Sequence, residues 1–446
     1  MYPPFFVIIG LDDTDSVYGM CTTYIGTLII EAIRDINRNL IKEPPKLIRL
    51  NPNNPYKTRG NGAVSIRIDE NTDPETIEKI KKVSFDIIKN YSETGENTNP
   101  AIIFLEDNSI NQEIQSFSER ALHELLTIEE AVSILEKIGA DYKFLGNGRG
   151  LIGSIASCGL KLEDFTYELI VYRSHTKRGK KTVSENGAME IEKKYSPRVF
   201  SSYDFENQRM VISPHSDCPI LYGIRGETPE ILFEAATLIE SENPFKRNLF
   251  VTNQATDMHL ETKKIQDVRP YSSVVVEGIV SKNPYTVLGG HVFFELSNGK
   301  NIFCAAYEPT KGFRNIVRKL VKGDNIRVYG GVLETEHGLT LNLEKLEILK
   351  LEELYKIEKP LCPTCKNQMK SIGKDKGHRC KKCHTKSDDV SKIPIPRDIQ
   401  TGYYEVPMCA KRHLSKPFVR YGRERKFEEE RFKFDYTKFD IQFEGI

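Results

Sequence analysis

The sequence predicts a multidomain α+β protein in which an N-terminal α+β region precedes an OB-fold β-barrel and a C-terminal zinc ribbon. Three observations support this prediction. The chain has 446 residues, enough for about two to four domains, each with its own core. Short alternating strands fill residues 271–350. Two Cys-x-x-Cys pairs follow within residues 362–383.

The composition excludes several classes of protein. Hydrophobic residues make up 39% and charged residues 28%, which is typical of a folded globular chain and not of a disordered one. No apolar run approaches the roughly 18 residues that a membrane-spanning helix needs. The first residues lack the basic segment of a signal peptide. We therefore expect a cytoplasmic enzyme that has no membrane partner.

The charge is unevenly distributed. The net charge is +1, but residues 356–386 hold ten Lys and Arg against two acids, and residues 410–426 hold seven against one. The remainder of the chain is therefore acidic. Basic segments of this kind are often only solvated surface, unless a folded module arranges them for a partner.

Four cysteines predict such a module. Cys362 and Cys365 form one pair and Cys380 and Cys383 a second, with fourteen residues between the pairs, and two such pairs complete a tetrahedral Zn²⁺ site. A ribbon of this size depends on its metal for folding. Its cations would suit a phosphate backbone, although a purely structural ribbon is the alternative. The cations named for RNA binding are Lys366, Lys370, Lys374, Arg379, Lys381 and Lys382, with Arg420 and Arg423 in the second basic segment.

The segment before the ribbon has the strand order of an OB-fold, in which three strands, a helix and two strands follow one another. The expected strands are 274–280, 291–296, 301–307, 324–333 and 340–349, and the expected helix is 313–320. OB barrels bind single-stranded nucleic acid through aromatic and basic side chains. A barrel followed by a basic ribbon therefore favours a nucleic-acid partner.

An acidic cluster follows the first predicted strand, Phe5–Ile9. Asp12, Asp13 and Asp15 lie within four residues, where they would repel one another unless a cation such as Mg²⁺ neutralised them beside nucleotide phosphates. Thr22 would lie near the start of the next helix, where backbone N–H groups favour phosphate. The alternative is that Asp15 or Thr22 is only a helix cap.

Two loops have residues that suit phosphate. The stretch 51–62 is rich in Pro, Asn and Gly and carries Lys57 and Arg59. The stretch 146–153 is a possible glycine nest with Gly148, Arg149 and Gly150, and its match to a dinucleotide fingerprint is weak because no βαβ unit surrounds it. Acids and cations together resemble the groups used in phosphoryl transfer.

The rest of the N-terminal region alternates strands and helices in a pattern that fits a ferredoxin-like unit. The turn 213–219 carries His215 and Asp217. For His215 we favour a structural role over a catalytic one. Asp217 is a candidate anion for a cationic substrate. Cys218 stands beside them in the same turn.

The chain resembles the archaeal 2-agmatinylcytidine synthetase family in motifs that occur in the same order along its whole length. The motifs are Gly10-Leu11-Asp12-Asp13-Thr14-Asp15-Ser16, Gly19-Met20-Cys21-Thr22-Thr23-Tyr24, Arg49-Leu50-Asn51-Pro52, Lys57-Thr58-Arg59-Gly60-Asn61, the loop 146–153, Tyr222-Gly223-Ile224-Arg225-Gly226, the barrel segment and the four cysteines.

The resemblance implies a fold and an activity. It implies a kinase-like α/β lobe (1–62 and 110–200) interwoven with a ferredoxin-like domain (63–109 and 201–265), an OB-fold (270–352), and a zinc ribbon with a basic C-terminal tail (356–446). The implied enzyme is an ATP-dependent ligase that joins agmatine to C2 of the wobble cytidine in the CAU anticodon of an isoleucine tRNA. The modified base then pairs with A, so that the tRNA reads AUA.

The resemblance also implies roles for residues. Asp12, Asp13 and Asp15 would hold Mg²⁺ and ATP, and Thr22 matches a threonine that the family phosphorylates on itself. Lys57 and Arg59 would steady the phosphates, while the barrel, the ribbon and its Zn²⁺ would hold the tRNA. The turn 213–219 departs from the family's pattern at residues 216–218, which weakens the assignment of Asp217 to the agmatine guanidinium.

Two alternatives come from other classes of protein. One is a non-catalytic OB and zinc-ribbon protein that coats single-stranded nucleic acid. The other is an ATP-dependent RNA-modifying enzyme that uses a different amine. The aspartate cluster argues against a pure binder, because three clustered carboxylates would repel phosphate.

Overall fold

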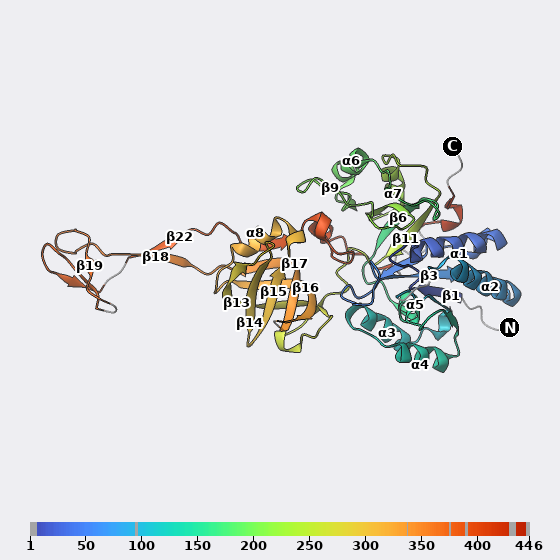
Figure 1. Cartoon of the computed structure of the whole chain (residues 1–446), viewed down its shortest axis with the longest axis horizontal. Coiled ribbons are helices and arrows are strands. Elements are labelled where there is room, and N and C mark those ends of the chain that lie inside the picture. Colours follow the sequence, from blue (N-terminus) through green and yellow to red (C-terminus); the bar gives the residue numbers. More distant parts are fainter. Residues whose placement is uncertain are drawn as a thin grey trace.

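The computed structural model describes residues 7–93, 97–336, 338–373, 376–388, 391–427 and 434–442. The molecule is elongated (Figure 1): the N-terminal α+β region lies at one end, the barrel in the middle and the ribbon at the other end. None of the helices in these ranges is long and apolar enough to cross a membrane.

The N-terminal region is built on one sheet of nine strands in the order β5-β4-β1-β3-β2-β11-β6-β10-β7. Its strands are β1 Val7–Asp12, β2 Lys46–Arg49, β3 Gly62–Ile68, β4 Ala101–Glu106, β5 Asp141–Phe144, β6 Thr166–Tyr172, β7 Val199–Phe200, β10 Ile220–Gly226 and β11 Lys246–Thr252. The short strands β8 Tyr203–Asp204 and β9 Arg209–Met210 form a separate hairpin. The helices are α1 Thr22–Ile36, α2 Pro74–Tyr91, α3 Gln112–His123, α4 Ile128–Ile138, α5 Gly150–Gly159, α6 Glu185–Tyr195 and α7 Pro229–Ala236.

Helix α1 shows why these segments adopt their structures. Its apolar residues recur with the helical period, and Ile25, Ile29 and Ile33 are all fully buried, so one face of the helix packs on the sheet. Helix α5 packs on β1, β3 and β4. It is short and rich in Gly, Ser and Ala, which lets its backbone come close to the strands. The end of β1 lies beside the start of α5, where a Cβ built at Gly150 would be 2.9 Å from the carbonyl oxygen of Asp12.

The strand pairing differs from the expected division of the N-terminal region. Residues 63–109 were expected to join 201–265, but β3 and β4 lie on either side of β1, with Ile9 opposite Ile66 and Phe104. Strand β6, expected in the lobe of the aspartates, pairs with β10 and β11. The two halves meet where β11 runs parallel to β2. Periodicity identifies strands but not their partners, which only long-range packing selects.

The barrel confirms the predicted OB order. Its strands are β13 Ser273–Thr286, β14 Val292–Asn298, β15 Lys300–Ala306, β16 Asn325–Thr335 and β17 Gly338–Lys350, with helix α8 Phe313–Arg318 between β15 and β16. Pairing runs β13-β14-β15-β17-β16 and closes through β13 and β16. Strand β12 Glu261–Thr262 pairs with β13 at the edge.

The ribbon stands on a two-stranded stalk, β18 Leu354–Glu358 and β22 Ser391–Ile395, and contains β19 Lys370–Ser371, β20 His378–Arg379 and β21 Lys386–Ser387. After the ribbon the chain returns to the barrel, where β23 Gly402–Glu405 pairs with β17. Residues 406–427, here called the C-terminal strap, then continue to the N-terminal region. The basic C-terminal segment, which we expected to form one unit with the ribbon, therefore packs on the barrel and on the N-terminal region.

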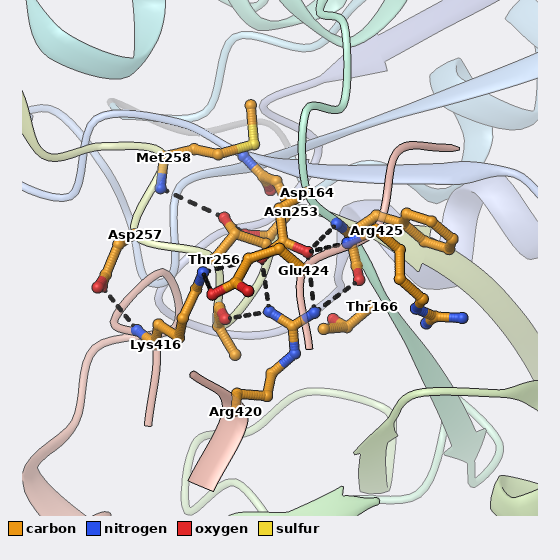
Figure 2. Close-up of polar contacts among 12 residues, drawn as sticks. Asp164, Thr166, Asn253, Thr256, Asp257, Met258, Lys416, Arg420, Glu424 and Arg425 are labelled. Atoms are coloured by element: carbon orange, nitrogen blue, oxygen red, sulfur yellow. Dashed lines mark hydrogen bonds and ion pairs between the residues drawn. The ribbon is translucent and has the colours of Figure 1, made fainter. Parts of the chain in front are cut away.

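The strap is anchored by buried ion pairs (Figure 2). Arg420, with none of its side chain exposed, donates to Asp164 at 2.8 and 2.9 Å. Its Nε also donates to Glu227 at 2.8 Å. Lys416 Nζ lies 3.2 Å from Asp164. The buried position of Arg420 does not support the predicted contact with RNA, because its charge is used inside the protein. Arg423 is exposed, and its contact with RNA stays a prediction.

Candidate active site

A cavity of about 410 Å³ opens where β1, β2, the start of α1 and the strap meet. It brings together most of the residues that the sequence singled out for catalysis, phosphate binding and agmatine binding. Those that line it are Asp12, Asp13, Asp15, Thr22, Lys57, Arg59, Arg149 and His215. They come from four separate stretches of the chain, and the sheet gathers them at one edge.

The aspartates form the acidic wall of the cavity. Burial and the charges of Asp13 and Asp15 raise the pKa of Asp12 well above its usual range. Burial also raises the pKa of Asp13 to about 6, although the backbone N–H of Asn99 donates to its Oδ2 at 3.1 Å. Carboxylates held this close without enough compensating charge are suited to a divalent cation. The donor set therefore fits Mg²⁺.

Arg59 is committed to this cluster. Its Nε and Nη2 lie 2.9 and 2.8 Å from Asp15 Oδ2, and its Nη2 also donates to the carbonyl of Gly19 at 3.3 Å. Thr98 Oγ1 donates to the carbonyl of Asp15 at 2.9 Å. Arg59 therefore fixes the β1–α1 loop and its carboxylate, in addition to facing the cavity.

Thr22 is the first residue of α1 and is 5% exposed. Its Oγ1 accepts a hydrogen bond from Thr14 Oγ1 at 3.2 Å. Because this bond uses a lone pair, the hydroxyl proton of Thr22 is left for another acceptor. Thr22 lines the cavity, and the N-cap position of α1 is occupied by Cys21 and not by Thr22.

The glycine loop contributes through Arg149. The guanidinium of Arg149 stacks on the ring of Tyr56, with its carbon 3.7 Å from the ring centre. Gly148 and Gly150 do not line the cavity, and the Gly150 N–H donates to the carbonyl of Asn99 at 3.2 Å. The predicted phosphate-binding role of these two glycines is not supported by their placement, because the loop packs against residues 99–101.

Lys57 also lines the cavity. Its Nζ donates to the carbonyl of Pro52. Burial and the nearby charge of Arg412 lower the pKa of Lys57 to about 8, with Glu344 opposing the shift. This lysine therefore lies among other cations, in surroundings that an anionic group would stabilise.

The turn 213–219 places its polar residues differently. His215 lines the cavity and its Nε2 lies 3.2 Å from Arg209 Nη2. Asp217 is exposed and does not line the cavity, whereas Cys218 is buried and does. Lys181 Nζ lies 3.4 Å from Cys218 Sγ and donates to the carbonyls of Pro214 and Ser216 at 3.0 Å each. The proposed guanidinium-binding role of Asp217 is therefore not supported by its position.

Sequence reasoning assigned no role to four charged or polar residues of the cavity. These are Arg49, Glu168, Arg225 and His413. Arg49 and Arg225 fall inside motifs that carried the family resemblance. Glu168 is the one charged residue of β6, a strand that is buried along its whole length, and His413 lies in the second basic segment. Their common location could not be inferred, since up to 364 positions separate them.

The zinc prediction is confirmed by the geometry. The Sγ atoms of Cys362, Cys365, Cys380 and Cys383 all lie within 4.8 Å of one another. Four thiolates in this arrangement fit a tetrahedral Zn²⁺ ion. Around them Lys366, Lys370, Arg379, Lys381 and Lys382 are exposed, while Lys374 lies outside the described residues.

The barrel presents aromatic side chains on one surface. Tyr285 is 47% exposed and stacks on Phe293, whose ring packs edge-on against Tyr307. Arg327, a basic residue of β16, is paired with Glu277 and Glu347 at 3.0 and 2.6 Å. The aromatic cluster is thus available for base stacking, whereas the charge of Arg327 is used in ion pairs between neighbouring strands.

The fold and the cavity together define a multidomain enzyme in which one acidic and cationic site is joined to nucleic-acid-binding modules. Four family models cover the chain in order. They are the TiaS TCKD domain (8–146), the TiaS FLD domain (148–259), an OB-fold nucleic acid binding domain (274–349) and the TiaS C-terminal zinc ribbon domain (359–399).

Whole proteins and solved structures agree with the models. The isoleucine-tRNA 2-agmatinylcytidine synthetase TiaS of Methanocaldococcus jannaschii is 41% identical over 92% of this chain and 98% of its own length. That of Pyrococcus horikoshii is 44% identical over 94% and 98%. A crystal structure of TiaS in complex with its isoleucine tRNA and ATP matches with a TM-score of 0.85 at 39% identity, covering 94% of this chain and 98% of that one. A complex of TiaS with the same tRNA, AMPCPP and agmatine matches with a TM-score of 0.81 at 37% identity and the same coverage. The chain belongs to the TiaS family.

Proposed function

We propose that this protein uses ATP to join agmatine to C2 of the wobble cytidine in an isoleucine tRNA with a CAU anticodon. The observation that carries the proposal is the aspartate-lined cavity in a chain whose four modules match TiaS over nearly its whole length. The product, 2-agmatinylcytidine, would let the tRNA read AUA. The enzyme would be an ATP-dependent ligase acting in the cytoplasm.

The reaction needs two steps because C2 of cytosine carries a poor leaving group. A phosphoryl group from ATP is first transferred to the C2 oxygen. The amine nitrogen of agmatine then forms a bond to C2, the C2–O bond breaks, and the oxygen leaves with the phosphate. The attacking nitrogen loses a proton. The protein must therefore hold a nucleotide, a base and an amine in one cavity.

The described residues can divide this work. Asp12, Asp13 and Asp15 would hold Mg²⁺, which neutralises phosphate charge when bound. Arg59 keeps Asp15 in place through the ion pair of 2.8 Å. Arg149, held on Tyr56, would contact phosphate at the cavity wall. The hydroxyl of Thr22 would accept a phosphoryl group from a separate ATP in self-phosphorylation, as the family resemblance implies, and not the group that goes to the C2 oxygen.

The barrel and ribbon would hold the tRNA. The exposed ribbon cations suit phosphodiesters, and Zn²⁺ would keep them in a fixed arrangement. The aromatic side chains of the barrel suit unpaired bases. A non-catalytic binder would need these modules but would have no use for the three clustered carboxylates.

The test is a transfer assay. The protein is incubated with ATP, labelled agmatine and a transcript of the CAU-anticodon isoleucine tRNA. We expect ATP-dependent label in the tRNA and none in a transcript whose wobble base is U. Asp12→Asn should abolish transfer and leave tRNA affinity unchanged. Label from another amine but not from agmatine would overturn the proposed substrate, and no transfer by folded, zinc-loaded protein would overturn the reaction.

A further inference from the structure

One wall of the cavity carries cations that surround a single carboxylate. Glu168 on β6 lies directly opposite Arg225 on β10, and Arg225 Nε donates to it at 3.1 Å. Arg49, the last residue of β2, lies 3.9 Å from the same carboxylate. Glu168 is 3% exposed. Two guanidinium groups therefore share one carboxylate, so this wall has excess positive charge.

The hydrogen-bonding capacity of Arg49 is poorly used. A guanidinium has five N–H donors, but Arg49 Nη1 reaches only the carbonyl of Gly60, at 3.5 Å. Its Nε has no hydrogen-bond partner among the residues that the structure describes. Burial lowers the pKa of Arg49, with Arg225 adding to the effect and Glu168 opposing it. An anion in the cavity would supply the missing partner.

His413 completes the group from the strap. The charge of Arg49, desolvation by the surrounding cavity wall, and the charges of Arg225 and Lys57 together lower the pKa of His413 well below its usual range. The imidazole is therefore neutral at neutral pH. Its Nδ1 lies 3.3 Å from Arg225 Nη2 and so accepts, which places the ring proton on Nε2.

Nε2 lies beside Arg49 and Gly60. A Cβ built at Gly60 would be 3.2 Å from His413 Nε2 and 2.6 Å from Arg49 Nη1. Glycine at position 60 thus leaves room for these two donors to come together at the cavity wall. Both residues line the cavity, so their N–H groups can reach one ligand.

The strap holds His413 in this position by backbone contacts. The Ala255 N–H donates to the carbonyl of His413, and the Asp257 N–H donates to that of Leu414, each at 2.8 Å. The preceding residue, Arg412, donates to Asn53 Oδ1 at 2.5 Å and lies 3.5 Å from Glu344 of the barrel. The same strap therefore contacts the barrel and sets the ring in the cavity.

We propose that Arg49, Arg225 and His413 form a phosphate-binding subsite in the cavity, separate from the site that the three aspartates form with a metal ion. The inference rests on the proposed function for its ligand, which is a phosphate group. Two sources share this chemistry: a phosphodiester beside the target cytidine of the RNA, and a phosphate of the nucleotide. Guanidinium groups bind phosphate directly, whereas the aspartates need a cation between.

The test measures binding without catalysis. His413→Ala and Arg49→Gln are compared with the wild type for affinity to the tRNA transcript without ATP, and for affinity to ATP without RNA, over the same series of salt concentrations. Arg38→Gln is the matched control, because it removes a guanidinium beyond the far end of α1, where its ion pair with Asp440 is half exposed. Thermal unfolding verifies that each variant is folded; His413→Ala removes no buried charge.

We expect an affinity loss of about tenfold or more in one arm, as for a lost hydrogen bond to a charged group. Weaker tRNA binding with unchanged ATP binding, together with a smaller salt dependence, assigns the subsite to an RNA phosphodiester. Weaker ATP binding with unchanged tRNA binding assigns it to the nucleotide. If both affinities of folded variants stay within about twofold of the wild type, the subsite does not exist. Agmatine transfer by the wild type tests the proposed function separately.

Discussion

Arg420 and Asp164, which are 256 positions apart, form a two-point ion pair at 2.8 and 2.9 Å with none of the arginine side chain exposed. This pair ties the C-terminal strap to the start of β6. The strap also carries His413, which lines the cavity. The Arg420–Asp164 pair therefore helps to hold one wall of the cavity in place.

Removing this arginine should destabilise the protein strongly. Arg420→Ala removes the buried cation that Asp164 and Glu227 share and leaves them only Lys416 and Arg425, and breaking a buried pair costs about 3–5 kcal/mol. Denaturant unfolding measures the loss. Arg423→Ala, an exposed arginine on the same strap, should change the free energy of unfolding by less than about 0.5 kcal/mol. Equal effects would contradict the anchoring role.

The same pair makes stability depend on pH. Burial alone would raise the pKa of Asp164, but the hydrogen bonds and charge of Arg420, with Lys416, lower it overall. The folded-state value is thus below the unfolded value of about 3.9. The stabilisation that this ion pair supplies is therefore complete above the unfolded pKa, and it is lost as the pH falls through the folded-state pKa of Asp164. Unfolding free energies measured between pH 6 and pH 2 should fall more steeply in the wild type than in Asp164→Asn.

Asp15 and Arg59 should act as a unit. Asp15→Asn and Arg59→Gln each break the ion pair that fixes the β1–α1 loop, so the double variant should lose little more activity than either single one. We expect a coupling energy of about 1–3 kcal/mol in kcat/KM for agmatine transfer. Additive losses would mean that Arg59 acts on the substrate independently of Asp15.

Gly153 should control the position of Asp12. A Cβ at Gly153 would lie 1.9 Å from Asp12 Oδ2, so Gly153→Ala must displace the carboxylate. Alanine favours the helix, and we expect a folded protein whose transfer rate is reduced about 100-fold, as for a misplaced catalytic group. Gly139→Ala is the control. Gly139 has a φ of 66° and no neighbour within 4 Å of its Cβ position, so the substitution should cost about 1 kcal/mol of stability and leave the transfer rate unchanged.

The ribbon should be separable from nucleotide binding. Cys365→Ser, or removal of zinc by a chelator, should unfold the ribbon and lower tRNA affinity, because the exposed cations lose their arrangement. ATP affinity should stay within about twofold of the wild type, since the stalk β18–β22 separates the ribbon from the cavity (Figure 1). Zinc content, filter binding and nucleotide titration measure the three effects. A parallel loss of ATP binding would contradict this separation.

Local patterns were enough to predict several modules. The five barrel strands and their helix appear where alternation and turn residues indicated them, because each strand's pattern lies within a few residues. The zinc cluster followed from spacing alone, since two short turns need no distant partner. The acidic loop after β1 was equally local, and its three carboxylates do line the cavity.

The pairing of strands could not be predicted in the same way. Strands β3 and β4 carry no pattern that would place β1 between them, and β6 gives no sign that it joins β10 and β11. The positions of Arg420 and Asp217 do not support their predicted roles, for a related reason. Their charges suggested that each contacts a ligand. Arg420 is instead buried in ion pairs and Asp217 faces solvent outside the cavity, and what packs around a charged side chain decides between these environments.

The sequence by itself determined the modules, the metal ligands, the acidic loop and the family, because these depend on residues close together in the chain. Only the tertiary structure decided that the second basic segment is a strap, that Arg420 is an internal anchor, and that His413 meets Arg49 and Arg225 across up to 364 positions. The physical reason is that charge and periodicity are local properties, whereas a cavity wall is made where distant strands pair and a returning segment is held against them.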